Sequence, residues 1–236
     1  MMAFDFITLA QQCAPQVSPA TMAAIVRTES SFNPYAIGVV HARLLRQPAS
    51  LEEATATVRA LEASGWDYSV GLAQVNRANW SRYGMSVQNA FDPCLNLAAG
   101  AAILQDCYAQ ARKSCSDVQG ALRASLSCYA SGDFTTGYRT GYVQRVVQNV
   151  ADSVSAHLVP SVPAIDPAVS LIPAIPAIPV VPLGRGGFPQ RSQRPILLPA
   201  QPASAGGPGP QVPQVPQGNP PRYPQGDPAD SSAVVF

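Results

Sequence analysis

The spacing of apolar and polar residues predicts a mostly helical structure for the first two thirds of the chain. Apolar residues at helical spacing predict a short helix over residues 4–13 and a second helix from Pro19 to Glu29, with Ser18 as its N-cap. Further helices are predicted from a capping box at Ser50 to a stop at Gly65, and over about 95–112, 117–129 and 139–156. Residues 67–77 hold apolar side chains without helical spacing, which predicts a short strand or hairpin. The pattern therefore predicts an α+β fold that is mostly helical with a small β element.

The composition changes sharply near residue 157. Residues 158–236 hold 19 of the 24 prolines, no cysteine, and few large apolar residues outside a stretch rich in valine, isoleucine and proline. Such a segment buries too little apolar surface to offset the entropy lost on ordering it. We therefore expect one domain over residues 1–157, followed by an extended, largely disordered proline-rich tail over residues 158–236.

Charge, histidine content and hydropathy exclude several classes of function. The 15 basic and 14 acidic residues nearly cancel, and no basic run is present, so nucleic acid is not an expected partner. The only histidines, His41 and His157, form no metal-ligand spacing with each other or with cysteine, so neither a metal nor a cofactor is expected. No run approaches the length of about 18 apolar residues that a membrane span requires. Residues 1–17 lack the basic start and the unbroken apolar core of a signal peptide, so no export route is indicated.

The cysteine content leaves the redox state open. An odd number leaves at least one thiol free in any intramolecular scheme, and reduced thiols or one or two disulfides are both compatible with the sequence. A nucleophilic cysteine is disfavoured because neither histidine lies in a motif that would orient it. All five cysteines lie in the predicted domain: Cys13, Cys94, Cys107, Cys115 and Cys128.

Glu29 is the main candidate for chemistry. Counted from Met22, the apolar residues Ile25 and Val26 fall at offsets 3 and 4, and Glu29 falls at offset 7 on the same helix face. Burial disfavours the charged form of a carboxyl group and raises its pKa, which makes such a group a proton donor near neutral pH. The alternatives are a glutamate paired with a buried arginine, or one turned toward solvent at the helix end.

Short motifs occur in a distinctive order along the predicted domain. They are Glu-Ser-x-Phe-Asn-Pro-x-Ala at 29–36, Gly-Leu-Ala-Gln-Val-Asn at 71–76, Cys-Tyr-Ala-Ser-Gly at 128–132 and Tyr-Val at 142–143. In this order they resemble the lytic transglycosylases of the goose-lysozyme-like superfamily. Residues 35–39 and 91–97 resemble, more narrowly, the VirB-type transglycosylases of type IV secretion systems. The resemblance covers about residues 5–155 and implies a lysozyme-like domain.

This resemblance implies cleavage of the glycosidic bond between N-acetylmuramic acid and N-acetylglucosamine in peptidoglycan. Glu29 matches the glutamate that protonates the leaving oxygen and then takes the proton of the muramyl hydroxymethyl group, which closes an anhydro ring without water. The resemblance also implies a periplasmic or cell-envelope location and local opening of the wall for a type IV secretion system. Components of that system are candidate partners of the proline-rich tail.

Residues near Glu29 in the motifs are implied to contact the substrate. Ser30 matches the serine that contacts the sugar or steadies the carboxylate, although it could instead cap the helix end. Gly71 and Gln74 match a strand that lines the cleft, with Ala73 in place of the usual methionine. Asn76 is expected to face the same side of that strand as Gln74, and a solvated edge strand is the alternative.

Two tyrosines complete the implied substrate site. Tyr129 matches the aromatic position of a motif in which Ala130 stands where asparagine is usual, a change that removes a polar sugar contact. Tyr142 matches a tyrosine that approaches the catalytic glutamate in relatives. As an alternative, Tyr138, Tyr142 and Val146 form a simple core stripe on a helix.

Two other functions remain open from the sequence. A hydrolytic lysozyme would use a second carboxylate, for which Asp67, Asp92 and Asp133 are the candidates. A glycan-binding scaffold of the secretion apparatus, with weak or no catalysis, is favoured by Ala130 and by the absence of a recognisable signal peptide. The presence of Glu29 favours an enzyme.

Overall fold

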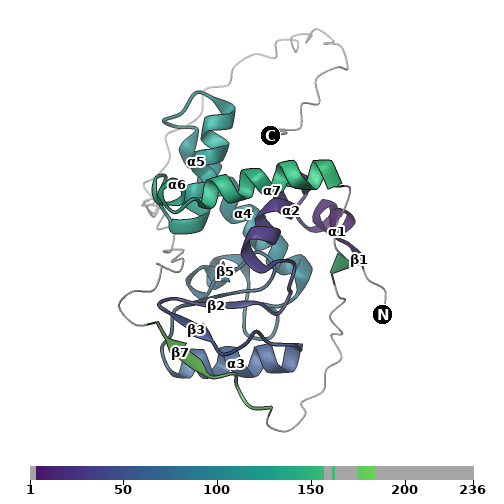
Figure 1. Ribbon diagram of the computed structural model, residues 1–236, viewed down its shortest axis with the longest axis vertical. Coiled ribbons are helices and arrows are strands. Elements are labelled where there is room, and N and C mark those ends of the chain that lie inside the picture. Colours follow the sequence, from purple (N-terminus) through teal and green to yellow (C-terminus); the bar gives the residue numbers. More distant parts are fainter. Residues whose placement is uncertain (1–3, 157–160, 163–174, 184–236) are drawn as a thin grey trace, which may run out of the picture. The chain divides into compact units, whose positions relative to one another are not determined.

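The computed structural model describes residues 4–156, 161–162 and 175–183, and its described part is mostly helical (Figure 1). The predicted α+β class with a small β element is therefore confirmed. The elements are β1 (Phe4–Asp5), α1 (Phe6–Cys13), α2 (Pro19–Ser30), β2 (Ile37–Val39), β3 (Ala42–Leu44), α3 (Leu51–Ala63), β4 (Tyr68–Val70), β5 (Val75–Asn76), the 3₁₀ helix η1 (Arg77–Tyr83), α4 (Pro93–Ala111), α5 (Val118–Ser131), α6 (Thr136–Arg139), α7 (Tyr142–Ala156), β6 (Ser161–Val162) and β7 (Val180–Pro182).

Helix α3 begins at the predicted capping box. The Ser50 side chain accepts the Glu53 N–H at 3.3 Å, and the Glu53 carboxylate accepts the Ala49 N–H at 2.9 Å. Glu53 also pairs with Arg46 through two nitrogen–oxygen contacts of 2.7 and 2.6 Å. The hydrogen bonds from Arg46 and from the Ala49 backbone lower the pKa of Glu53 to about 2. Residues 46–53 are thus held together at the start of α3.

The small β element is an antiparallel sheet in the order β2-β4-β5. The predicted hairpin is confirmed as β4 and β5, but β2 and β3 were not predicted. Each of these two strands is three residues long, too short for the alternation of apolar and polar residues to identify it. The register of β2 on β4 pairs Ile37 with Val70, Gly38 with Ser69 and Val39 with Tyr68.

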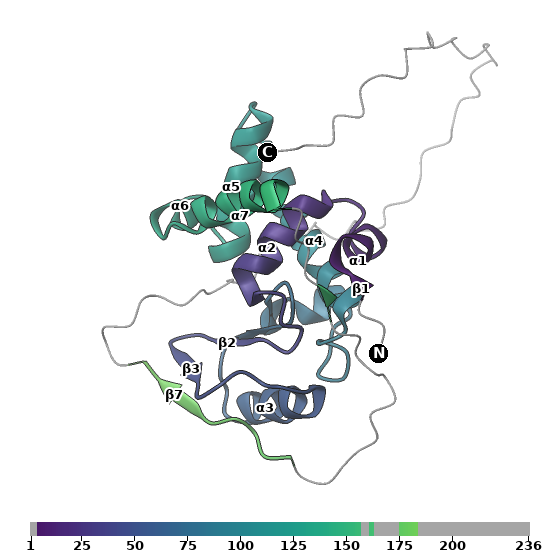
Figure 2. The ribbon, with the colours of Figure 1, turned by 45° about the vertical axis from the view of Figure 1, so that its right-hand side comes forward.

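The helices pack in two main contacts, α2 on α7 and α4 on α5, which are visible in two views (Figures 1 and 2). The predicted helix over 139–156 is observed as α7, which begins three residues later, and the short helix α6 before it was not predicted. Gly141 lies between them with a φ of 70°, a conformation outside the helical region. The break makes Tyr142 the first residue of α7.

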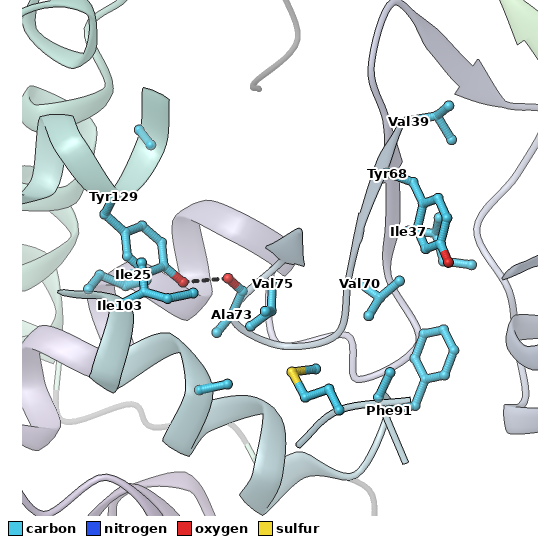
Figure 3. Packing of buried hydrophobic residues seen from close by; sticks show 14 of the residues in the cluster. Ile25, Ile37, Val39, Tyr68, Val70, Ala73, Val75, Phe91, Ile103 and Tyr129 are labelled. Carbon is cyan, nitrogen blue, oxygen red and sulfur yellow. Dashed lines mark hydrogen bonds between the residues drawn. The ribbon is translucent and has the colours of Figure 1, made fainter. Parts of the chain in front are cut away.

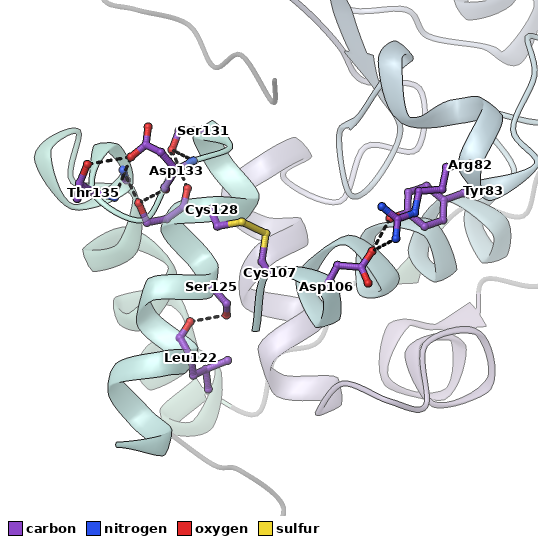
Figure 4. The surroundings of a disulfide bond; sticks show 12 residues. Arg82, Tyr83, Asp106, Cys107, Leu122, Ser125, Cys128, Ser131, Asp133 and Thr135 are labelled. Atoms are coloured by element: carbon purple, nitrogen blue, oxygen red, sulfur yellow. Dashed lines mark hydrogen bonds and ion pairs between the residues drawn. A yellow bond between two sulfur atoms is a disulfide. The ribbon is translucent and has the colours of Figure 1, made fainter. Parts of the chain in front are cut away.

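Two disulfides connect the helices, which decides the alternatives left open by the sequence. Cys13 at the end of α1 is bonded to Cys94 at the start of α4, and Cys107 of α4 is bonded to Cys128 of α5 (Figure 4). Cys115 is a free cysteine with an intermediate exposure. Beside the second disulfide, Asp106 accepts a hydrogen bond from the Tyr83 hydroxyl at 3.1 Å and pairs with Arg82 at 2.8 Å.

Two segments of the predicted tail depart from the expectation of disorder. β6 pairs antiparallel with β1, and residues 175–183 are described, with β7 antiparallel to β3. The prediction missed both segments because local composition does not reveal a partner strand more than a hundred residues away. Residues 157–160, 163–174 and 184–236 lie outside the described residues. Within the described ranges, no helix has the length and apolar character needed to cross a bilayer.

Candidate active site

Glu29 lies in the last turn of α2 and is partly buried. Its Oε1 accepts a hydrogen bond of 2.7 Å from the hydroxyl of Tyr142, which is the first residue of α7. The packing of α2 on α7 produces this contact, and Asn149 of α7 adds a 2.8 Å hydrogen bond to the Thr28 hydroxyl. The predicted approach of Tyr142 to Glu29 is therefore confirmed, and the carboxyl group is held in one orientation.

Tyr142 is suited to remain a hydrogen-bond donor. Its side chain is 2% exposed, and its ring lies 5.9 Å from the Arg145 guanidinium carbon. Burial raises the pKa of Tyr142 well above 10, the negative charge that Tyr129 would carry raises it further, and Arg145 opposes both effects. The phenol therefore stays protonated and donates to Glu29 throughout the physiological range.

A tight turn over Gly71–Gln74 lies beside the end of α2. The Ser30 hydroxyl donates to the Leu72 carbonyl at 2.8 Å and to the Val26 carbonyl at 3.1 Å, so it connects the helix end to the turn. Gly71 has a φ of 79° and Gln74 a φ of 46°, both in the left-handed region. The prediction that Gly71 and Gln74 belong to one strand is wrong, because these dihedral angles reverse the chain between β4 and β5.

The turn is held by buried side chains from α4 and α5. Asn96 accepts the Ala73 N–H at 2.8 Å and donates to the Val70 and Ala90 carbonyls, each at 3.0 Å. The Tyr129 hydroxyl, on a side chain 1% exposed, donates to the Ala73 carbonyl (Figure 3). The turn next to Glu29 is therefore fixed by contacts from two helices.

Asn96 is the site residue that the sequence analysis missed. The signal was present, because a fully buried asparagine interrupts the apolar face of α4. A buried amide must find hydrogen-bond partners, and here all of them are backbone groups around the turn. The asparagine that the resemblance expected at position 130 is instead Ala130, which is 4% exposed.

Gln74 and Asn76 bind the protein's own backbone and side chains. The Gln74 amide donates to the Ala36 carbonyl at 2.9 Å and to the Gly71 carbonyl at 3.0 Å. Asn76 is fully buried, and its amide nitrogen donates to the Asp67 carboxylate at 2.7 Å. The two side chains do not share one face of a strand, because Gln74 lies in the turn before β5. Substrate contact stays a prediction for all six residues expected to make it: Ser30, Gly71, Gln74, Asn76, Tyr129 and Tyr142.

Each candidate for a second carboxylate has a structural role. Asp67 accepts from Asn76, and Asp92 caps α4 by accepting the Leu95 N–H at 2.7 Å. Burial works to raise the pKa of Asp133, but hydrogen bonds from Thr136 and Thr135 outweigh it and hold that pKa well below its ordinary value. These contacts favour a site with Glu29 as its working carboxyl group. Within the described ranges, no cluster of three histidine, cysteine or acidic side chains is arranged to hold a metal ion.

Comparison with known proteins finds a protein family and several relatives that match this chain. A family profile described as "Transglycosylase SLT domain" matches residues 6–149. The chain is 58% identical over 148 residues to the type IV secretion system protein virB1 of Brucella suis biovar 1, covering 60% of this chain and 62% of that protein. It is 34% identical over 160 residues to the protein virB1 of Agrobacterium fabrum, covering 68% of this chain and 63% of that protein.

The chain thus spans less than two thirds of the length of these relatives. No solved structure matches it. The family profile covers more than half of the chain and contains Glu29, the turn over Gly71–Gln74 and Tyr142. The chain therefore belongs to the Transglycosylase SLT domain family, and its similarity to virB1 proteins bears out the resemblance to the VirB-type members.

Proposed function

We propose that this protein is a lytic transglycosylase that cleaves the bond between N-acetylmuramic acid and N-acetylglucosamine in peptidoglycan. The observation that carries the proposal is the partly buried carboxyl group of Glu29, oriented by Tyr142 beside the turn that Ser30 connects to α2. Membership of the Transglycosylase SLT domain family supports the same reaction class.

Glu29 performs both proton transfers in the proposed mechanism. The protonated carboxyl group first gives its proton to the glycosidic oxygen, and the bond from that oxygen to the muramyl anomeric carbon breaks. The resulting carboxylate then removes the proton from the muramyl hydroxymethyl oxygen, which attacks the anomeric carbon and closes the anhydro ring. The proton returns to Glu29, so each turnover leaves the enzyme in its starting state.

The surroundings of Glu29 suit a mechanism with one carboxyl group. Hydrolytic glycosidases generally use two carboxyl groups about 5–10 Å apart, one of which acts as nucleophile or activates water. Here Asp67, Asp92 and Asp133 are engaged in contacts that stabilise a hairpin, a helix start and a loop. An internal hydroxyl group of the substrate replaces the attacking water, so no second carboxylate is required.

We place this reaction at the cell envelope, where it would open the wall locally for a type IV secretion system. The Cys13–Cys94 and Cys107–Cys128 disulfides support this location, because disulfides persist in oxidising compartments such as the periplasm. The virB1 relatives from Brucella carry the type IV secretion system in their names. Components of that system are then candidate partners of the proline-rich tail.

The proposal is tested by mass spectrometry of fragments released from purified peptidoglycan. Wild type is expected to release anhydro-muramyl products, and Glu29→Gln, which keeps the shape but removes the titrating group, is expected to release none. Glu52→Gln on α3 is the matched control, because it makes the same chemical change away from the site. It should release anhydro products at the wild-type rate.

Other outcomes identify the alternative functions. Reducing-end products that depend on Glu29 would contradict the transglycosylase and indicate a hydrolytic lysozyme. Glycan binding without release by wild type would indicate a scaffold. Equal release of anhydro products by wild type and Glu29→Gln would remove Glu29 from the mechanism.

A further inference from the structure

Residues 175–183 contain β7, which forms a two-stranded sheet with β3 and lies outside the part of the chain that the family profile matches. Figure 1 shows β7 beside β3, on the part of the fold that also contains α3. The segment is remote in sequence, since β3 ends at Leu44 and β7 begins at Val180. Its register opposes Ala42 to Pro182, Arg43 to Val181 and Leu44 to Val180.

Pro182 of this segment occupies a position that an edge strand tolerates, whereas Pro179, just before β7, accepts a hydrogen bond from the end of β3 and cannot return one. The Leu45 N–H donates to the Pro179 carbonyl and the Leu183 N–H donates to the His41 carbonyl, both at 3.0 Å. Hydrogen-bonded and non-hydrogen-bonded pairs of residues alternate along two antiparallel strands. Pro182, which faces Ala42, belongs to a non-hydrogen-bonded pair, so its backbone groups point away from β3. Its missing N–H therefore removes nothing from the ladder. It removes a donor from the outer edge instead, which discourages addition of another strand.

Ile178 anchors the segment in the core. Its side chain is 5% exposed and belongs to the main cluster of buried apolar residues, against which Val180 also packs. Its N–H donates at 3.0 Å to the hydroxyl of Thr57, a fully buried residue of α3. The Thr57 hydroxyl in turn donates to the Glu53 carbonyl at 2.7 Å. Thr57 thus presents an acceptor to the strand while its own proton is used within α3.

β3 and α3 therefore offer three features to the segment. They are the backbone edge of β3, an apolar position that takes the Ile178 side chain, and the buried Thr57 hydroxyl as an acceptor. Strand addition of this kind takes its affinity from backbone hydrogen bonds and its selectivity from pockets for alternate side chains. The features of the segment that fit are an isoleucine, a proline directly after it, and a second proline at an outward-facing position.

We propose that β3 and α3 form a binding groove for an extended, proline-interrupted apolar peptide, and that residues 175–183 of the same chain occupy it. The folded domain then continues to Leu183, the last described residue of the docked segment. The domain boundary at 157 that the composition suggested moves to 183.

The test is hydrogen exchange of individual backbone amides in the full-length chain. In wild type, the amides of Leu45, Ile178 and Leu183 are expected to exchange slowly, because each donates one of the docking hydrogen bonds. Ile178→Asp places a charge at the buried position and is expected to bring the Leu183 amide to the rate of an unstructured peptide. Pro176→Asp is the matched control, because it adds the same charge at an exposed position of the segment.

Leu183 is the decisive amide. In the Ile178→Asp variant, Ile175 and Pro176 could shift into the places of Ile178 and Pro179 and keep the Leu45 amide protected. After such a shift, the N–H of a different residue would donate to the His41 carbonyl, and the Leu183 amide would lose its hydrogen bond and exchange fast. The Gly71 amide, which donates to the Ala36 carbonyl at 2.9 Å, reports whether the variant is folded and should stay protected in both variants.

A peptide added in trans tests the groove independently of the covalent connection. A synthetic peptide of residues 175–183, added at about millimolar concentration to Ile178→Asp, is expected to bind in the groove, so that its own Leu183 amide exchanges slowly. Fast exchange of the peptide's Leu183 amide at this concentration would overturn the groove. Fast exchange of Leu183 in wild type would overturn docking itself, and protection that appears only in a dimer would assign the occupant to a second copy.

Discussion

Glu29 and Tyr142 are 113 residues apart in the chain, yet a 2.7 Å hydrogen bond joins them. The bond assigns different tasks to the two side chains. The pKa of Tyr142 is raised well above 10 by burial, so the phenol keeps its proton and serves as a permanent donor. Glu29 is left as the group of this pair that exchanges protons in the proposed reaction. Tyr142 is thus a positioning residue.

Replacement of Tyr142 by phenylalanine tests this assignment. The variant keeps the buried ring and loses the hydrogen bond to the carboxyl group. A hydrogen bond to a charged group is worth about 1.5–3 kcal/mol, so kcat on purified peptidoglycan should fall by about 10- to 100-fold. The measurement is the rate of anhydro-product release at saturating substrate, alongside a thermal unfolding curve.

Tyr138→Phe is the control, because Tyr138 lies four residues earlier, in α6, and is 38% exposed. Its activity should match wild type. A Tyr142→Phe variant that is folded and fully active would show that orientation of Glu29 does not depend on this bond.

At the scale of elements, the turn over Gly71–Gln74 is held on all sides. Ser30 bonds to the Leu72 carbonyl, Tyr129 to the Ala73 carbonyl and Asn96 to the Ala73 N–H. A β-carbon on Gly71 would lie 2.3 Å from the Asn96 amide nitrogen. The close approach of Asn96, together with the positive φ, explains why this position requires glycine.

A pair of alanine variants separates these two requirements. Gly65 has a similar φ of 69° but no neighbouring atom within 4 Å of an added β-carbon. Gly65→Ala should cost about 1–2 kcal/mol of unfolding free energy from backbone strain alone. Gly71→Ala should cost about 3–5 kcal/mol, because displaced Asn96 would also leave buried backbone groups unpaired. Urea unfolding measures both, and equal losses would contradict the role given to Asn96.

At the scale of the whole described domain, one disulfide joins helices far apart in sequence, α1 and α4, and the other joins the consecutive helices α4 and α5. Cys13 and Cys94 are 81 residues apart, whereas Cys107 and Cys128 are 21 residues apart. A crosslink restricts the unfolded chain more when it closes a longer loop. The disulfide between α1 and α4 should therefore contribute more to stability than the one between α4 and α5.

Alanine variants of each cysteine pair test this order. In the chain-entropy description, removal of the Cys107–Cys128 bond should cost about 3 kcal/mol and removal of the Cys13–Cys94 bond about 4.5 kcal/mol. Denaturant unfolding without reductant measures both losses, and Cys115→Ala, which removes a free thiol, should have little effect. The reverse order would show that packing in the native state outweighs the loop term.

Prediction from the sequence succeeded where the determining interactions are local. The spacing of apolar residues located α1, α2, α3, α4 and α5 to within a few residues, because a helix buries one stripe of its own side chains. It failed for β2 and β3, since a strand of three residues is defined by its partner. It also missed the single turn of α6 and began the last helix three residues before α7, because the break at Gly141 depends on a backbone conformation that the apolar pattern does not show.

The same distinction applies to the candidate site and to the tail. The sequence by itself determined that Glu29 lies on the inner face of its helix, and its motifs identified Tyr142 as a neighbour. Only the tertiary structure decided that Gln74 binds backbone carbonyls and Asn76 the Asp67 carboxylate, that Asn96 holds the turn, which cysteines pair, and that residues 175–183 return to β3. Local periodicity reports which side of an element is buried. The identity of the atoms that meet it depends on contacts between residues distant in the chain, which no local pattern encodes.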